Sequence, residues 1–317
     1  MNGAAHRSYR ATDEPTVSAP TRTSVAPPRL ASLSATRRQL EHSSRSQVFA
    51  RDGSRLLRAW GSPERPWVLA VEPRAKRWAV EAWGADARTA RAAARALFSL
   101  DHPIEQFYRL VRREPSLAGT DRRFRGLRLP RDANLYESLL HAVIGQQLSV
   151  PAALSIQRRL FEATASVLEA DGVEVPCVPS PTALRALGDD GLRGVGLSGA
   201  KTRALLGLTT PSTRAVLDWP GWATAPVEEA VARLVGLYGV GRWTAENALL
   251  RGTGRVDVFV AGDLGIRAAL AEYGVLPRSA AEAEARAWAA RWYPGWGSYA
   301  TLYLWRRLGA DRRARTG

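Results

Sequence analysis

The chain has 317 residues, of which 45% are hydrophobic and 24% charged, a composition typical of globular proteins of roughly two domains. Its net charge of +15 and pI of about 11.0 favour a polyanionic partner, nucleic acid before a membrane surface. A lone cysteine argues against disulfides and a cysteine metal cage, and scattered histidines argue against a histidine site; without a signal-peptide core or an apolar run near ~20 residues, we expect a cytoplasmic protein with no membrane partner.

The first part of the chain changes character near residue 46. Residues 1–45 are rich in Ser, Thr, Pro, Ala and Arg and lack a hydrophobic period, so we expect a disordered tail. Short alternating runs separated by turn residues then predict a small antiparallel sheet. These runs are Ser46–Phe49, Leu56–Trp60, Trp67–Glu72 and Arg77–Trp83. Asp86 is expected to cap a following helix, so residues 46–101 form a small α+β domain.

Residues 102–309 predict an all-α domain of many short helices joined by short loops. Helices are expected at Pro103–Arg113, Leu135–Gln147, Pro151–Val167, Val227–Leu237, Trp243–Leu250, Leu264–Tyr273, Ala280–Trp292 and Ser298–Leu308. The basic residues 310–317 are expected to form a C-terminal tail. The fold class is therefore mainly α, preceded by a small antiparallel sheet.

A tight glycine turn joins two of these helices. Glycines at 239 and 241 permit positive φ and close approach of the backbone to a ligand. The first amides of the next helix lack helical partners and lie at the positive end of its dipole. The turn is therefore a candidate site for a DNA phosphate, continued by Arg242 and Thr244; an ordinary αα turn is the alternative. A second such turn makes Gly199 and Lys201 further candidates, with the same alternative.

The run LxGLYGVGRWTA, followed by VDVFVAGD, resembles the helix-hairpin-helix DNA glycosylase superfamily. GVGRWTA, DVFVAGD, GQQLSV and WGSYATLYLW make residues 47–309 similar to its alkylation-repair branch, the 3-methyladenine DNA glycosylase II family. The resemblance implies a helix-hairpin-helix core behind a small α+β domain. It also implies a monomer, in the bacterial cytoplasm at the nucleoid, that excises alkylated purines from double-stranded DNA by hydrolysis and leaves an abasic site.

Asp263 matches the catalytic aspartate of that family. It precedes a predicted helix, so its expected place is an N-cap, where the helix dipole keeps it ionised. A glycosylase flips the base and breaks its bond to C1′ through an oxocarbenium-like transition state, which a carboxylate can stabilise. Taken alone, the position favours an ordinary N-cap; the family match favours catalysis.

Aromatic side chains are the expected walls of the base pocket. Trp243 and Trp305 match the family's pocket aromatics, and Tyr136 and Tyr299 are further candidates; core packing is the alternative for each. Aromatic faces favour a cationic alkylated base. Asn247 departs from the pattern, which has a tyrosine there, and an asparagine can donate a hydrogen bond to a base edge. Trp243 also replaces the lysine with which lyase members form a Schiff base, so we expect a monofunctional enzyme.

The resemblance implies three further features. Gln147 falls on the position that intercalates into the DNA, with Leu148 as the fallback; a buried helix end is the alternative. The carbonyls of Val235, Leu237 and Val240 are candidates to bind a monovalent cation, Na or K, at the hairpin. No other cofactor is expected, and one cysteine rules out the four-cysteine iron–sulfur loop of some relatives.

Two other functions remain open from the sequence. A glycosylase for deaminated bases, such as hypoxanthine or uracil, needs the same fold and the same aspartate. A non-catalytic helix-hairpin-helix DNA-binding protein needs only the hairpin, and Asp263 with its tryptophans argues against it. A purely structural all-α protein accounts for the fewest of these residues.

Overall fold

The computed structural model describes residues 19–41, 43 and 45–316. The predicted fold class, a mainly α protein with a small N-terminal antiparallel sheet, is confirmed. Residues 1–18 of the expected disordered tail lie outside the described residues.

Five antiparallel strands form the sheet in the order β1-β5-β4-β3-β2. They are β1 (Thr21–Val25), β2 (Phe49–Asp52), β3 (Arg55–Ser62), β4 (Arg65–Pro73) and β5 (Trp78–Trp83). Helices α1 (Leu33–Glu41) and α2 (Ala87–Leu97) cover one face. Asp86 caps α2 as predicted, its carboxylate accepting from the Thr89 amide at 2.7 Å.

The expectation that the chain is disordered up to residue 45 is wrong for residues 21–41. There β1 pairs with β5, with Thr23 opposite Val80, and α1 follows. Val25, Leu33 and Leu40 are buried in the core of the sheet. The composition conceals this segment because its few apolar residues are widely spaced and its partner strand lies far along the chain, which leaves no local period.

A second, two-stranded sheet corrects the prediction that residues 102–309 are all-α. Helix α6 (Val150–Ala163) ends earlier than predicted, where Ala165 adopts a positive φ of 48°. Strands β6 (Val167–Ala170) and β7 (Val173–Pro176) then form a hairpin on the other face of the five-stranded sheet, burying Ala170 and Val175. The small domain therefore draws on segments well outside residues 46–101.

The remaining elements are helical and surround one large apolar core. They are α3 (Ile104–Val111), α4 (Thr120–Arg123), α5 (Leu135–Gly145), α7 (Pro181–Gly194), α8 (Gly199–Gly207), α9 (Pro211–Leu217), α10 (Val227–Val235), α11 (Arg242–Gly252), α12 (Leu264–Glu272), α13 (Glu282–Trp292) and α14 (Gly297–Thr316), with 3-10 turns η1 (Ser46–Val48), η2 (Pro115–Leu117) and η3 (Pro220–Ala223).

Side-chain caps explain where several of the helices begin. Ser149, Ser180, Ser198 and Thr210 each accept a hydrogen bond from an amide in the first turn of α6, α7, α8 and α9. Helix α11, like α3, α4, α10 and α13, has no such cap, because its N-cap is Gly241, which has no side chain to offer. The first amides of α11 therefore lack this kind of partner.

The predicted basic tail at 310–317 is instead part of α14, which continues to Thr316; Gly317 lies outside the described residues. Asp311 ties this extension to its surroundings, accepting a hydrogen bond from the Tyr273 hydroxyl at 2.9 Å and pairing with Arg123. Arg315 pairs with Glu272 on α12. The positive charge of this segment favoured a solvated tail in the sequence. In the structure its arginines form ion pairs, and the helix continues.

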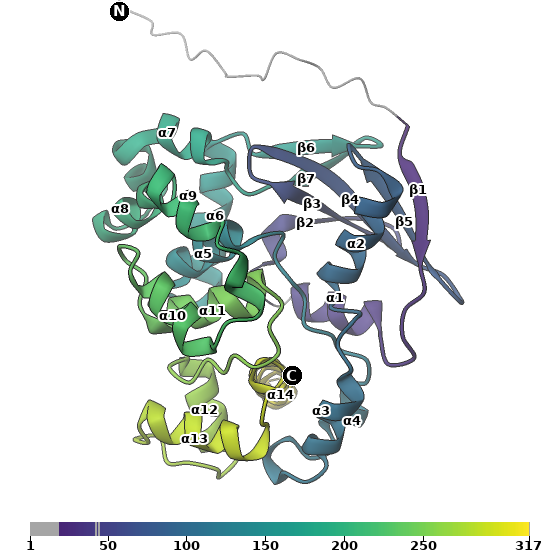
Figure 1. Ribbon diagram of the computed structural model, residues 1–317, viewed down its shortest axis with the longest axis vertical. Helices are drawn as coiled ribbons and strands as arrows, with labels where there is room; N and C mark the ends of the chain where they lie inside the picture. The colour runs from purple at the N-terminus through teal and green to yellow at the C-terminus, as the bar shows by residue number, and fades with distance from the viewer. Residues whose placement is uncertain (1–18, 42, 44, 317) are drawn as a thin grey trace, which may run out of the picture.

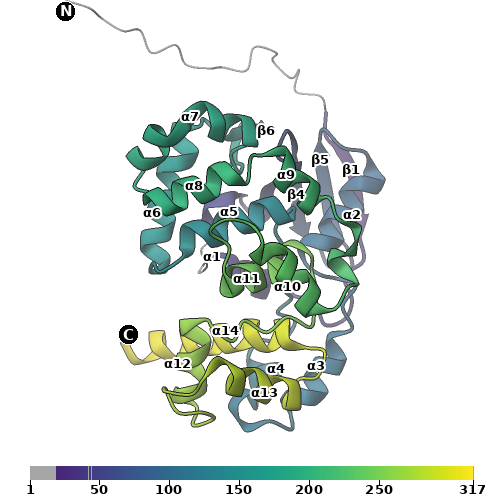
Figure 2. The same ribbon diagram turned by 60° about the vertical axis from the view of Figure 1, so that its left-hand side comes forward.

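Helices α5–α11 form one block beside the sheet. Below this block, α12–α14 form a second layer together with α3 and α4 (Figure 1). Figure 2 shows α14 running along the underside of the first block, opposite α11 and α5. No helix within the described residues is long and apolar enough to cross a membrane.

Candidate active site

A cavity of about 1260 Å³ lies between the two helical layers. Its lining comes from α5, α6, α8 and α11 on one side, from α14 and the start of α12 on the other, and from the end of α1. Asp263, Trp243, Trp305 and Asn247 all line it. The fold thus brings together residues from both ends and the middle of the chain.

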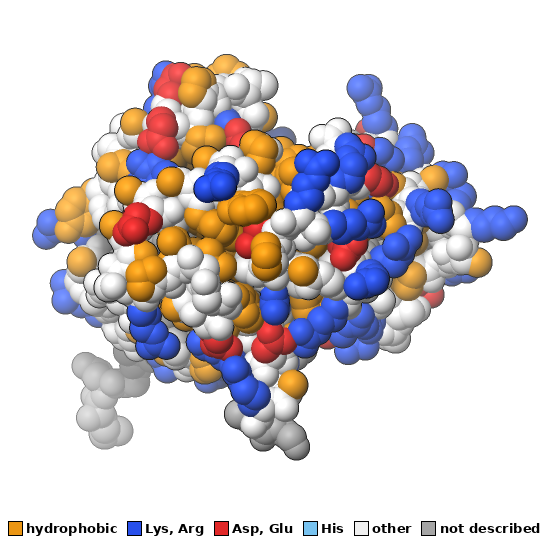
Figure 3. Space-filling view, turned by 90° about the horizontal axis from the view of Figure 1, so that it is seen from below, with side chains coloured by type: hydrophobic (Ala, Val, Ile, Leu, Met, Phe, Trp, Pro, Cys, Tyr) orange, Lys and Arg blue, Asp and Glu red, His pale blue; other side chains and the backbone are white. Residues whose placement is uncertain are grey.

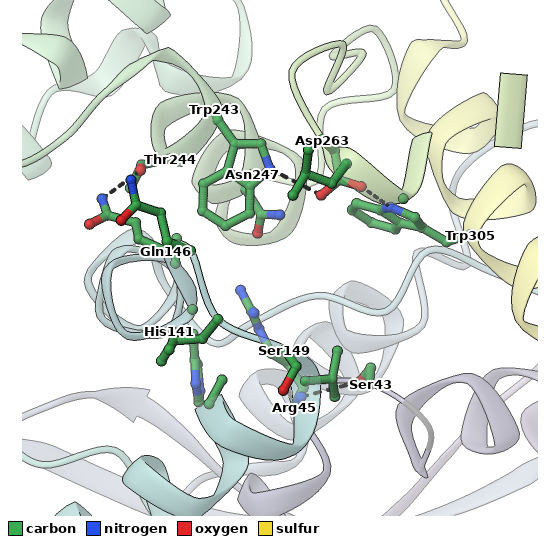
Figure 4. A pocket seen from close by; sticks show the side chains of 18 of the residues that line it. Ser43, Arg45, His141, Gln146, Ser149, Trp243, Thr244, Asn247, Asp263 and Trp305 are labelled. Atoms are coloured by element: carbon green, nitrogen blue, oxygen red, sulfur yellow. Dashed lines mark hydrogen bonds between the residues drawn. The ribbon is translucent and has the colours of Figure 1, made fainter. Parts of the chain in front are cut away.

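Asp263 is held from three directions in this cavity. It is the N-cap of α12, and its Oδ1 accepts from the Ile266 amide at 3.0 Å and from the Trp305 indole Nε1 at 2.8 Å. Its Oδ2 accepts from the Trp243 indole Nε1 at 3.0 Å. The two indoles reach the carboxylate from opposite sides (Figure 4). Such donors fix the direction in which its remaining lone pairs point.

Gly265, which the sequence did not single out, makes room for this arrangement. A Cβ on it would lie 3.0 Å from Asp263 Oδ1 and 3.4 Å from Trp305 Cδ1. A side chain there would press on the carboxylate and one of its indole donors. Its position two residues after Asp263 is the sequence feature that could have identified it.

Trp243 and Trp305 are half-buried, from the first turn of α11 and from α14. Neither is a pure core residue, because each lines the cavity and donates to Asp263. Arg251 lies near Trp305, its guanidinium carbon 5.6 Å from the ring centroid. Burial, together with nearby Arg45, lowers the pKa of Arg251 to about 10. A fixed cation therefore already faces one of the pocket aromatics.

Tyr136 and Tyr299 do not line the cavity and are removed from the predicted pocket. The Tyr136 hydroxyl donates to the Pro179 carbonyl at 2.9 Å, on another side of α5. Tyr136 precedes the cavity-lining His141 by five positions, about 140° around a helix. Tyr299 is fully buried, with its hydroxyl 3.0 Å from His102 Nδ1, and lies about 120° around α14 from Trp305.

The hairpin between α10 and α11 uses its glycines differently. Gly239 has a φ of +76°, and a Cβ there would lie 2.6 Å from the Cβ of Ala204. Gly241 has an ordinary φ of −83°, and a Cβ there would meet nothing within 4 Å. Gly239 therefore shapes the turn, while Gly241 leaves the start of α11 open.

The two polar side chains predicted beside this turn are engaged within the protein. Arg242 pairs with Glu228 at 2.5 Å and with Glu246 at 2.9 Å, and the hydrogen bond to Glu228 is the main cause of its raised pKa. Thr244 is buried, and its Oγ1 accepts from Gln146 Nε2 at 2.8 Å. Any phosphate contact here falls to the backbone amides.

Lys201 also has a partner that the sequence did not indicate. Its Nζ donates to the carbonyls of Ile144 and Gln146 at 2.8 and 2.7 Å, and burial lowers its pKa. Gly199 lies in the first turn of α8, beyond the Ser198 cap, and does not line the cavity. We therefore infer that Lys201 holds the end of α5 and does not bind a phosphate.

Gln146 links the loop after α5 to the hairpin. Its Nε2 donates to the Gly239 carbonyl and to Thr244 Oγ1, both at 2.8 Å. The next residues, Gln147 and Leu148, are exposed and line the cavity. Gln147 has a φ of +54°, a backbone conformation that residues other than glycine rarely adopt. Lys201 and Gln146 thus hold a strained loop that presents both wedge candidates outward.

Nothing within the described residues forms a cluster of three or more His, Cys, Asp or Glu suited to a metal. The hairpin carbonyls are a separate matter. The Leu237 carbonyl accepts from the Val240 amide at 3.1 Å, which leaves one of its two lone pairs. The monovalent cation expected at these carbonyls therefore stays a prediction.

Basic side chains gather on the surface beside the second layer. Arg109, Arg112, Arg113, Arg122, Arg123 and Arg125 are all exposed. Figure 3, which views the molecule from below, shows Lys and Arg side chains gathered on the right half of this face. The cavity rim carries Arg306 on α14, whose pKa is lowered by burial and by nearby Arg313. Basic side chains thus lie both at the cavity rim and beside the second layer, where Arg112 and Arg123 pair with Asp121 and Asp311.

No family model matches the chain, whereas a comparison with curated proteins finds relatives that are named as DNA repair enzymes. The DNA-3-methyladenine glycosylase 2 of Escherichia coli is 33% identical over 57% of this chain and 60% of its own length. A probable bifunctional transcriptional activator/DNA repair enzyme AlkA of Mycobacterium tuberculosis is 35% identical over 70% of this chain and 43% of its own length. The chain thus matches less than two thirds of either relative.

The fold of a solved 3-methyladenine DNA-glycosylase from Archaeoglobus fulgidus matches with a TM-score of 0.76. The superposition covers 90% of this chain and 96% of that one, at 22% identity. At this identity the likeness concerns the fold, including the N-terminal sheet.

Proposed function

We propose that the chain belongs to the helix-hairpin-helix DNA glycosylases, in the 3-methyladenine DNA glycosylase II branch, and that it excises alkylated purines from double-stranded DNA in base excision repair. The observation that carries the proposal is the Asp263 carboxylate, fixed by two indole N–H groups at the wall of a cavity large enough for a flipped nucleotide.

The proposed reaction uses the geometry of this carboxylate. Breaking the bond between base and C1′ develops positive charge on the sugar. Three donors orient Asp263 before the reaction, so it stabilises that charge without reorganising. An alkylated purine leaves as a neutral base, so no paired general acid is required. Water then adds to C1′, and an abasic site remains.

The grip on DNA is proposed to come from the backbone. The uncapped amides at the start of α11 bind a phosphate without reading sequence. The exposed loop at Gln147 and Leu148 fills the gap that the flipped base leaves. The basic surface beside the cavity adds attraction that depends on salt.

We propose that the enzyme is monofunctional, without lyase activity. Of the two lysines in the chain, Lys76 and Lys201, only Lys201 lines the cavity. Its Nζ donates to the carbonyls of Ile144 and Gln146, so this side chain is committed to the end of α5. Trp243 occupies the first turn of α11, where lyase members carry their lysine.

We also propose a monovalent cation at the carbonyls of Val235, Leu237 and Val240, with no other cofactor. DNA binding in NaCl, KCl and choline chloride at one ionic strength tests this, because choline cannot enter such a site. A monomer in the cytoplasm, at the nucleoid, is the proposed working form.

The decisive assay uses duplexes that each hold one lesion: 3-methyladenine, hypoxanthine, uracil or 8-oxoguanine. After incubation, alkali converts abasic sites into strand breaks. We expect release of the alkylated base, no break without alkali and a loss of activity in Asp263→Asn of at least about 100-fold. Full activity of that variant contradicts the catalytic role, release of hypoxanthine or uracil alone transfers the proposal to deaminated bases, and trapping by borohydride refutes the monofunctional reaction.

A further inference from the structure

Asn247 has a side-chain oxygen without a hydrogen-bond partner among the described residues. It lies on α11 at 8% exposure, and its Oδ1 is buried and unsatisfied. Figure 4 shows it between Trp243 and Asp263, with the amide directed toward the open part of the cavity. Buried polar groups are almost always satisfied in native proteins, so this one requires an explanation.

The neighbouring polar groups do not supply a partner. The indole N–H groups of Trp243 and Trp305 both donate to Asp263. Thr244, on the same helix, accepts from Gln146. The polar groups around Asn247 therefore bond to one another and leave its side-chain oxygen unpaired.

Resting on the proposed function, we propose that Asn247 is the specificity residue of the pocket and hydrogen-bonds the edge of the flipped base. An asparagine amide offers a donor and an acceptor side by side. It therefore selects a purine whose edge presents an N–H beside an acceptor, as the exocyclic amino group and ring nitrogen of an adenine derivative do. The tryptophans contact the faces of the base, and Asn247 reads its edge.

The chain contains a matched control for this proposal. Gln157 on α6 is fully buried, and both polar atoms of its amide lack partners, but it does not line the cavity. Replacing either amide by leucine removes a buried unsatisfied group of similar size. A structural role therefore predicts the same outcome for Asn247→Leu and Gln157→Leu, whereas recognition of the base separates them.

The test compares two free bases, 3-methyladenine and 3-methylpurine, which differ only by the exocyclic amino group. Their binding is followed by quenching of tryptophan fluorescence, so that no excision is needed. The unmodified protein and Gln157→Leu are expected to bind 3-methyladenine more tightly by about 10-fold or more, because the analogue leaves the Asn247 oxygen unpaired. Asn247→Leu and Asn247→Ala are expected to bind both bases within about threefold, and thermal unfolding of Asn247→Leu should be no lower than that of the unmodified protein.

Equal binding of the two bases by the unmodified protein overturns the proposal, as does a preference for 3-methyladenine that persists in Asn247→Leu or Asn247→Ala. A preference that disappears in Gln157→Leu as well overturns it too. Release of 3-methyladenine from methylated DNA, and its loss in Asp263→Asn, tests the proposed function separately. A protein that excises normally but ignores the amino group refutes only the role of Asn247.

Discussion

Replacing Trp243 by phenylalanine removes one hydrogen bond from Asp263, the proposed catalytic carboxylate, and keeps an aromatic ring. Within the described chain, Trp243 Nε1 is the only donor to Asp263 Oδ2, whereas Oδ1 accepts from both Trp305 and Ile266. A hydrogen bond to a charged group contributes about 1.5–3 kcal/mol. If that bond positions the carboxylate for the transition state, kcat falls by about 10- to 150-fold.

The same geometry sets an order between the two tryptophans. Trp305→Phe leaves Oδ1 with the Ile266 amide, so its kcat should fall less than that of Trp243→Phe. Steady-state excision of 3-methyladenine gives kcat and KM for both variants. Trp292→Phe, a half-buried tryptophan outside the cavity, is the control and should keep the kcat of the unmodified protein. An unchanged kcat with a raised KM in Trp243→Phe would refute the positioning role and leave only binding of the base.

Three further outcomes are expected. Gly239→Ala should lower the midpoint of thermal unfolding because its Cβ meets Ala204 in a left-handed turn, whereas Gly241→Ala should leave that midpoint unchanged within about 2 °C and weaken DNA binding by crowding the amides of α11. Lys201→Met should reduce base flipping, reported by 2-aminopurine fluorescence beside the lesion, and slow excision about 10-fold; Lys76→Met, at an exposed lysine, is its control. Burial, with Arg131 nearby, lowers the pKa of His102 from 6.5 to about 4, so its unfolded state takes up a proton first as the pH falls. The free energy of unfolding should therefore drop by about 3 kcal/mol between pH 6.5 and 4. Chemical denaturation of His102→Gln over the same pH range should not show this loss.

Each of these has a contrary result. Equal thermal midpoints for the two glycine variants contradict the assignment of the turn to Gly239. If 2-aminopurine fluorescence in Lys201→Met equals that of the unmodified protein, the loop after α5 has no part in base flipping. Parallel stability profiles for His102→Gln and the unmodified protein show that this histidine titrates alike in both states.

The sequence predicted the centre of the molecule well because its signals there are local. Gly239, the following helix and an aspartate before the next helix all lie within one stretch, and the structure places the aspartate at the N-cap of α12 as expected. The five-stranded sheet was recognised for the same reason in its consecutive strands β2 to β5. Strand β1 was missed because its partner is distant in the chain.

Side-chain direction limited the prediction of the pocket. Tyr136 and Tyr299 lie on the correct helices and face away from the cavity, since a family motif fixes the helix and not the side on which a tyrosine points. The opposite error concerned Arg242 and Lys201, whose charge suggested a phosphate. Both have partners inside the protein that lie far away in sequence or on another helix.

The position of Trp305 in the chain has a consequence for biosynthesis. The carboxylate it holds belongs to residue 263, and the cavity also takes Gln39 and Arg45 from near the start of the described chain. During synthesis the earlier helices can pack while α14 is still inside the ribosome. Under the proposed function, the hydrolytic centre is then incomplete, so a nascent or truncated chain that carries the hairpin is expected to hold DNA without releasing a base from it.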